Sequence, residues 1–127
     1  MKQENQQSKR AKGNYGEDFS VALLEKDGYT IICRNYTFNG GEVDIIAAKE
    51  QYLCFVEVKT RSIQSGESAA CAVDEQKTAR LKKGVEEFYR EFNEDPHISS
   101  LIPRIDIMEI YTDNGIVKSH NHIPGIS

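Results

Sequence analysis

Two stretches of sequence decide the fold: GEVDIIA over residues 41–47 and FVEVKTR over residues 55–61. Both are rich in β-branched and aromatic residues, which favour strands. A polar turn at Glu50-Gln51 lies between them, and an Asn39-Gly40-Gly41 turn links them to an earlier run of the same kind. The pattern predicts a three-stranded antiparallel meander, with strands over residues 30–38, 42–48 and 52–60.

The rest of the chain is predicted to complete one α/β domain. Helical periodicity runs from Lys9 to Asp27, and Gly28 is typical of a residue that follows a helix. Asp74 is suited to cap a second helix that ends near Asn93. The predicted order is α-β-β-β-α-β-β, with a mobile loop over residues 61–73, a connector over 96–103 and final strands over 104–112 and 116–122. We expect a mixed sheet flanked by helices in a single domain over residues 9–127, after a disordered tail over residues 1–8.

Length and composition fit a soluble globular protein. The chain has 127 residues, of which 39% are hydrophobic and 28% charged. No apolar run approaches the ~18 residues of a membrane helix, and the polar N-terminus is unlike a secretory signal, so we expect a cytoplasmic protein with no membrane partner. The net charge of −4 argues against indiscriminate coating of nucleic acid. Three widely spaced cysteines exclude a disulfide framework.

Charged residues gather at one end of the predicted hairpin. With a two-residue turn, Asp44 faces Glu57 and Glu42 faces Lys59, all on one face of the sheet. Directly opposed side chains have Cβ atoms about 4.5–5.5 Å apart, and like charges in that position repel. The neighbours of these residues are apolar on both faces, which indicates a covered sheet.

Two facing carboxylates are tolerated when a cation lies between them. Mg²⁺ accepts one or two carboxylates and completes its shell with water and phosphate oxygens. Lys59 could hold a phosphate oxygen or the attacking water, so Asp44, Glu57 and Lys59 together favour phosphodiester hydrolysis. Two alternatives remain: Glu42 and Lys59 form a plain ion pair, or the acids are exposed at a sheet edge.

A known signature has the same residues at the same spacing. Asp44 followed by Glu57-Val58-Lys59 resembles the PD-(D/E)XK nuclease signature, and the predicted element order is similar to the core of that superfamily. The proline that gives the signature its first letter is absent, because Val43 precedes Asp44. The resemblance implies a restriction-endonuclease-like fold.

A closer resemblance covers about residues 13–81. The chain resembles the YraN-like family of small bacterial endonuclease-like proteins. The residues that carry this likeness are Gly16-Glu17, Gly28-Tyr29, Asn35 and the stretches over 41–47 and 55–61. Family membership by itself does not establish activity, since a fold does not supply a reaction.

The superfamily resemblance also implies residue roles. It implies a metal bound by Asp44, Glu57 and the Val58 carbonyl, with Lys59 assisting the water. It implies Glu17, on the first helix, as a further acidic member of the site. The alternative for Glu17 is a solvated helix charge.

A basic surface is predicted on the second helix. Lys77 lies four residues before Leu81, in line with the apolar face, so it points toward the sheet near an anion-friendly helix start. The alternative is a lysine that covers apolar surface. Candidate phosphate-backbone contacts are Lys77, Arg80, Lys82, Lys83 and Arg61, with Lys9, Arg10 and Lys12 of the tail. The alternative for this set is a solvated helix face.

These observations favour a Mg²⁺- or Mn²⁺-dependent endonuclease. We expect DNA rather than RNA as substrate, with branched and single-stranded DNA as candidates, because nothing in the chain resembles a base-reading element. A homodimer is left open. The second hypothesis is a catalytically silent nucleic-acid-binding or scaffold protein with the same fold. His120 and His122 share a strand face, but with no third cysteine or histidine near them we expect no metal there.

Overall fold

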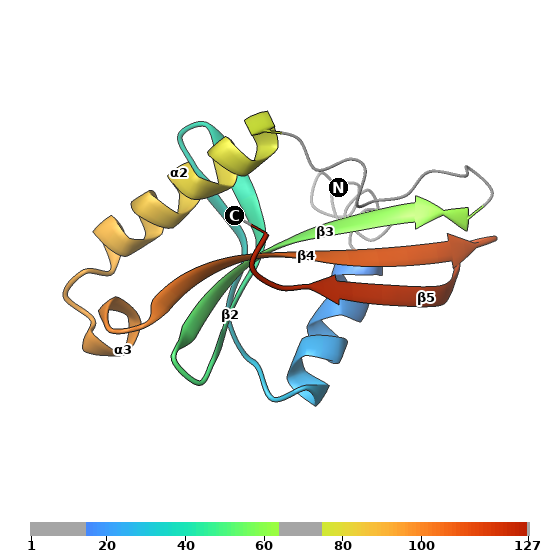
Figure 1. Ribbon diagram of the computed structural model, residues 1–127, viewed down its shortest axis with the longest axis horizontal. Coiled ribbons are helices and arrows are strands. Elements are labelled where there is room, and N and C mark those ends of the chain that lie inside the picture. Colours follow the sequence, from blue (N-terminus) through green and yellow to red (C-terminus); the bar gives the residue numbers. More distant parts are fainter. Residues whose placement is uncertain (1–14, 64–74, 127) are drawn as a thin grey trace, which may run out of the picture.

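A five-stranded mixed sheet with helices on both faces forms the molecule (Figure 1). The computed structural model describes residues 15–63 and 75–126. The strands are β1 (Thr30–Phe38), β2 (Gly41–Lys49), β3 (Tyr52–Ser62), β4 (Ile102–Asp113) and β5 (Ile116–Ile123). The helices are the first helix (15–26), α2 (Glu75–Glu91) and α3 (Pro96–Ser99). The predicted α/β class, with its mixed sheet and order α-β-β-β-α-β-β, is confirmed, with α3 as an added short helix.

The strands lie side by side in chain order. Strands β3 and β4 run parallel, and the other neighbouring pairs run antiparallel. The predicted two-residue turn is confirmed, because Lys49 pairs with Tyr52 across Glu50 and Gln51. Parallel strands need a long crossover, and α2 and α3 lie within the one that joins β3 to β4.

Several boundaries differ from the sequence prediction. Strand β3 continues to Ser62, into the predicted loop, because Ser62 still pairs with Thr112 of β4. The predicted connector contains α3, which Asp95 caps by accepting a hydrogen bond from the His97 backbone N–H. A four-residue helix is too short to show a period. The predicted tail over residues 1–8, the capping residue Asp74 and residues 64–73 of the predicted loop lie outside the described residues.

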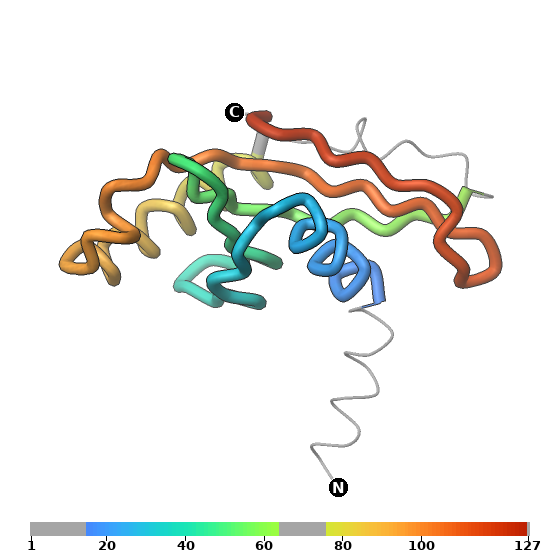
Figure 2. The backbone as a smooth tube through the Cα atoms, turned by 90° about the horizontal axis from the view of Figure 1, so that it is seen from below, coloured from blue at the N-terminus to red at the C-terminus, as the bar shows by residue number. Residues whose placement is uncertain are grey.

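The two long helices cover opposite faces of the sheet (Figures 1 and 2). Leu24 of the first helix packs against one core cluster, which includes Val56, while Phe88 of α2 packs against another, which includes Phe55. Adjacent residues of β3 thus pack into the cores on opposite faces of the sheet, as expected for a strand that is buried on both faces. Among the helices of the described residues, none has both the length and the hydrophobicity that a membrane crossing requires.

Two glycines allow the helices to approach the sheet closely. A Cβ at Gly84 would lie 2.8 Å from the Phe38 ring, and a Cβ at Gly16 would collide with the Thr60 hydroxyl. A larger residue at either position would require the helix or the contacted side chain to move. Gly16 therefore fixes the start of the first helix against β3, directly before Glu17.

Candidate active site

The candidate site lies where β2 separates from β3. The paired residues of this ladder, within the described chain, end at Ile45 and Val56. Beyond that point the Asp44 Oδ2 atom accepts a hydrogen bond of 2.8 Å from the Val58 backbone N–H. The carboxylate thus takes the place that a backbone carbonyl of β2 would have in a regular ladder.

This geometry corrects the predicted cross-strand pairs. Neither Asp44 with Glu57 nor Glu42 with Lys59 is among the β2–β3 pairs of the described residues, and Glu42 is exposed. The prediction was wrong because it assumed that the ladder continues beyond Ile45. A side chain, rather than the backbone, joins the two strands at this point.

A shift in side-chain alternation explains why Asp44 points into the gap. Val43 and Ile46 both pack in the core under α2, whereas Ile45 packs in the core under the first helix. Strict alternation would place Val43 and Ile45 on the same face. The alternation therefore shifts by one residue at Asp44, and its side chain is directed toward β3.

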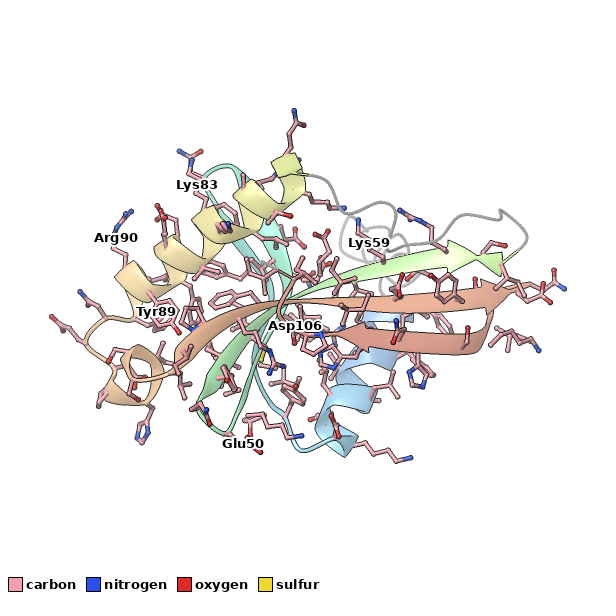
Figure 3. All side chains as sticks on the ribbon, in the orientation of Figure 1. Glu50, Lys59, Lys83, Tyr89, Arg90 and Asp106 are labelled. Atoms are coloured by element: carbon pink, nitrogen blue, oxygen red, sulfur yellow. The ribbon has the colours of Figure 1, made fainter. Side chains whose placement is uncertain are left out.

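Glu57, Lys59 and Lys77 form a charged group on the α2 side of the sheet. The Lys77 Nζ atom lies 2.9 Å from the Glu57 Oε1 atom. Lys59 extends from β3 toward the side where α2 begins (Figure 3), and it is only 5% exposed. Burial lowers the pKa of Lys59, and the neighbouring Lys77 lowers it further, against the opposing attraction of Glu57. This group combines a carboxylate with two amines at one end of the sheet.

Glu17 lies on the first helix and is 5% exposed, so it is not a solvated helix charge. Its Oε1 atom accepts a hydrogen bond of 3.2 Å from the Arg34 Nε atom. Burial raises the pKa of Glu17, and Arg34 opposes this rise. The charge of Glu17 is also felt at Asp44. Glu17 is therefore a buried acid on the flank of the Asp44 gap.

Asp44 carries the clearest electrostatic strain of the site. The pKa of Asp44 is raised to about 6, mainly by burial and also by the negative charges of Glu57, Glu17 and Glu42, while the Val58 N–H opposes the rise. An acid in such surroundings is stabilised by a proton or by a cation. The site thus attracts positive charge at Asp44.

A divalent cation fits the donors of this site. Asp44 and Glu57 supply two carboxylates, and the implied third ligand is the Val58 carbonyl on the same strand as Glu57. Two carboxylates with water and phosphate oxygens form a common Mg²⁺ shell. Within the described residues, no three His, Cys, Asp or Glu side chains are grouped to hold a metal, so any such ion depends on water, backbone or substrate oxygens.

The predicted basic residues have different neighbours in the structure. Lys77 joins the Glu57 and Lys59 group. Arg80 lies next to Gly41. Lys83 lies next to Gly40, in the turn between β1 and β2 (Figure 3). Lys82 lines a separate hollow with Pro103 and Ile105. The Arg61 guanidinium donates to the Thr60 carbonyl. The predicted Lys9, Arg10 and Lys12 lie outside the described residues.

Sequence reasoning missed a buried polar network at the other side of the sheet. Asp106 is fully buried, and its carboxylate accepts hydrogen bonds from Arg104, His122 and the Gly125 backbone N–H. Arg104 also donates to the Tyr29 hydroxyl at 2.7 Å. Asp106 lies between Ile105 and Ile107 in the sequence, and a charged residue in such an apolar stretch could have indicated a buried polar contact. The Nε2 atom of His122 is hydrogen bonded to Asp106 in this network. From the sequence, no metal was expected at His122.

Replacing Asp44 with asparagine is expected to stabilise the fold by roughly 1–3 kcal/mol at about pH 8. Asparagine avoids the buried charge and can still accept the Val58 N–H. Because the folded chain holds the Asp44 proton more tightly than the unfolded chain, this group lowers stability as pH rises from about 4 to about 6. Urea unfolding at both ends of this pH range should show that the free energy of unfolding of Asp44→Asn exceeds that of wild type by more at the higher pH. Glu25→Gln is the control, because Glu25 is exposed and is not among the charges that raise the pKa of Asp44. A difference in unfolding free energy between wild type and Asp44→Asn that stays constant with pH would contradict the prediction.

The chain is similar to a family of bacterial proteins along most of its length. The model described as "Uncharacterised protein family UPF0102" matches residues 16–110. A UPF0102 protein of Carboxydothermus hydrogenoformans is 35% identical over 114 residues, which cover 89% of this chain and 93% of the relative. UPF0102 protein FP2501 of Flavobacterium psychrophilum is 42% identical over 101 residues, covering 80% and 81%. A UPF0102 protein of Dictyoglomus thermophilum is 44% identical over 98 residues, covering 77% and 80%.

Proposed function

The chain belongs to family UPF0102, the YraN family, and from that premise we propose that it is a Mg²⁺- or Mn²⁺-dependent endonuclease that hydrolyses phosphodiester bonds in DNA. The observation that carries the proposal is the placement of Asp44 in the gap between β2 and β3, next to the strand that bears Glu57 and Lys59. The raised pKa of Asp44 supports it, since the site favours added positive charge.

Each residue has a distinct role in the proposed reaction. Asp44 and Glu57 would hold the divalent ion with the Val58 carbonyl, and the ion would lower the pKa of a bound water and polarise the phosphoryl oxygen. Lys59 donates hydrogen bonds to the attacking water or to a non-bridging phosphate oxygen, where negative charge grows in the transition state. Glu17, held by Arg34, would orient water at the flank of the gap.

Lys77 would change partners when substrate binds. In the structure its ammonium pairs with Glu57 at 2.9 Å. A cation at Asp44 and Glu57 would compete for that carboxylate, which frees Lys77 to contact a phosphate at the start of α2. Such contacts position a nucleic-acid backbone without reading its sequence, so we expect selection by DNA structure.

The test is metal-dependent cleavage of linear, flapped, single-stranded and four-way-junction DNA. The wild-type protein is expected to cut at least one substrate with Mg²⁺ or Mn²⁺ and none with EDTA. Asp44→Ala should abolish the cleavage, whereas Glu42→Gln, an exposed carboxylate two residues away, should retain it. Equal rates for wild type and Asp44→Ala would show that the cleavage comes from elsewhere and would end the proposal.

A second candidate is a nucleic-acid-binding or scaffold protein without turnover. The observation that favours it is the Lys77–Glu57 ion pair, which neutralises one of the two proposed ligands. A Mn²⁺ titration separates the candidates. The enzyme should bind Mn²⁺ with an affinity that falls sharply in Asp44→Ala, while the scaffold would show no such Asp44-dependent binding.

A further inference from the structure

Asn35 has a backbone conformation that is unusual for its position. Its φ angle is +53°, in the left-handed region that residues other than glycine rarely adopt. The other described non-glycine residues with positive φ are Glu50 and Asn114, and both lie in turns between strands. Asn35 is instead inside β1, where an extended conformation is the rule. A left-handed residue inside a strand is unfavourable, so the surrounding structure must hold it in this conformation.

The reason lies directly across the ladder. The pairs Arg34–Ile45 and Tyr36–Val43 flank this point, so Asn35 lies opposite Asp44. The register is the same on both sides of this point, unlike the shift between Ile31 and Cys33, so no extra residue is inserted and both strands change faces together. Asn35 and Asp44 are therefore the two halves of one shift.

The side chains of β1 also change faces of the sheet at this point. Cys33 and Tyr36 both pack in the core under α2, although residues three apart on a strand belong on opposite faces. Arg34, between them, reaches Glu17 on the first helix. The left-handed residue rotates the strand between Arg34 and Tyr36, and β2 follows through its ladder with β1.

The Asn35 side chain adds a second contact to the site. It lies near enough to the Glu17 carboxylate to lower its pKa, and Arg34 donates a hydrogen bond to the same carboxylate. Asn35 thus lies beside one acid and opposite the other across the ladder. Asparagine suits both tasks, because its short polar side chain tolerates the left-handed region better than other non-glycine side chains.

We propose that Asn35 is a positioning residue, whose left-handed backbone turns Asp44 into the gap beside β3 and whose side chain lies beside Glu17. That these acids serve a metal rests on the proposed function. The backbone part stands on the structure alone: without the shift at Asn35, β2 would continue its regular ladder with β3, and Asp44 would lose the Val58 N–H.

Hydrogen exchange of the Val58 amide tests the backbone part without metal or DNA. Asn35→Val disfavours positive φ and is expected to speed exchange at Val58 by at least about 10-fold. Asn35→Gly adopts positive φ freely and should stay within about 3-fold of wild type. Asn114→Val imposes the same backbone restriction in the β4–β5 turn and should leave Val58 unchanged. Should Asn35→Val not fold, Asn35→Ala provides the same comparison with a smaller side chain.

The amide part is tested by Mn²⁺ binding in the same variants. Asn35→Gly should bind Mn²⁺ more weakly than wild type but more tightly than Asn35→Val, which should lose about 10- to 100-fold. Normal Val58 exchange in Asn35→Val, or equally fast exchange in Asn35→Gly, would overturn the backbone role. Equal Mn²⁺ affinity in wild type and Asn35→Gly would overturn the amide role. A wild type that binds no Mn²⁺ would refute the proposed function while the exchange result still decides the backbone role.

Discussion

Replacing Asp106 with alanine is expected to lower the free energy of unfolding by about 3–5 kcal/mol, since it removes the carboxylate that compensates the charge of a mostly buried arginine. The Asp106 carboxylate is fully buried and accepts from the Arg104 Nε and Nη2 atoms at 2.9 Å each and from the His122 Nε2 atom at 2.7 Å. Truncation would leave the Arg104 guanidinium with the Tyr29 hydroxyl but no carboxylate, and would remove the acceptor of the His122 imidazole. Urea unfolding at about pH 7 measures the loss.

The loss of unfolding free energy in Asp106→Ala should depend on pH, because Asp106 titrates differently in the folded and unfolded chains. Burial alone would raise the pKa of Asp106, but hydrogen bonds from His122, Arg104 and Gly125 hold it below its usual value. The stabilisation is therefore present above the unfolded-state pKa and is lost as pH falls through the lower folded-state pKa. The difference in free energy of unfolding between wild type and Asp106→Ala should therefore become smaller at acidic pH.

Asp27→Asn is the matched control for Asp106. Asp27 pairs with Lys49 at 3.6 Å, but its side chain is 68% exposed, so the change should stay within about 0.5 kcal/mol. Equal losses for Asp27→Asn and Asp106→Ala would show that burial and hydrogen bonding of Asp106 do not set its contribution.

Replacing Lys59 with methionine is expected to reduce DNA cleavage by at least about 10²–10³-fold, the usual effect of removing one charge-stabilising donor from a transition state. Methionine preserves the volume and the packing of this buried side chain. It also removes an ammonium that is costly to bury, so the protein should fold at least as stably as wild type. Single-turnover cleavage with saturating metal, together with urea unfolding, separates the two effects.

Lys118→Met is the control for Lys59, because Lys118 is an exposed lysine on β5. Its cleavage rate should match that of wild type. A Lys59→Met protein that folds and cleaves at the wild-type rate would exclude Lys59 from the chemistry and leave Asp44 and Glu57 as a binding site only.

The strands and their turns could be predicted because their signals are local. Alternating β-branched residues and the Glu50-Gln51 turn determine the hairpin, and the structure pairs Lys49 with Tyr52 as expected. The orientation of Lys77 toward the sheet also followed from helical spacing, and its ammonium reaches Glu57. These features depend on residues that are close in sequence.

The geometry of the charged end could not be predicted by counting along the strands. The count assumes that side chains alternate without interruption, but one left-handed residue at Asn35 shifts the faces of two strands. An asparagine within a strand pattern does not by itself reveal a positive φ. The Asp106 network was hidden for a different reason, since Arg104, His122 and Gly125 meet only after β4 and β5 pair.

The parallel pairing of β3 with β4 sets the order in which this chain can assemble. Tyr52 pairs with Ile102, and the same offset continues to Ser62 and Thr112, so every contact of this ladder closes a loop of 50 residues. The meander of β1, β2 and β3 needs only short loops. Distant pairing slows folding, because chain entropy is lost before any contact compensates for it. We therefore expect slow folding for a chain of this size, with the outer edge of β3 open to self-association until β4 arrives.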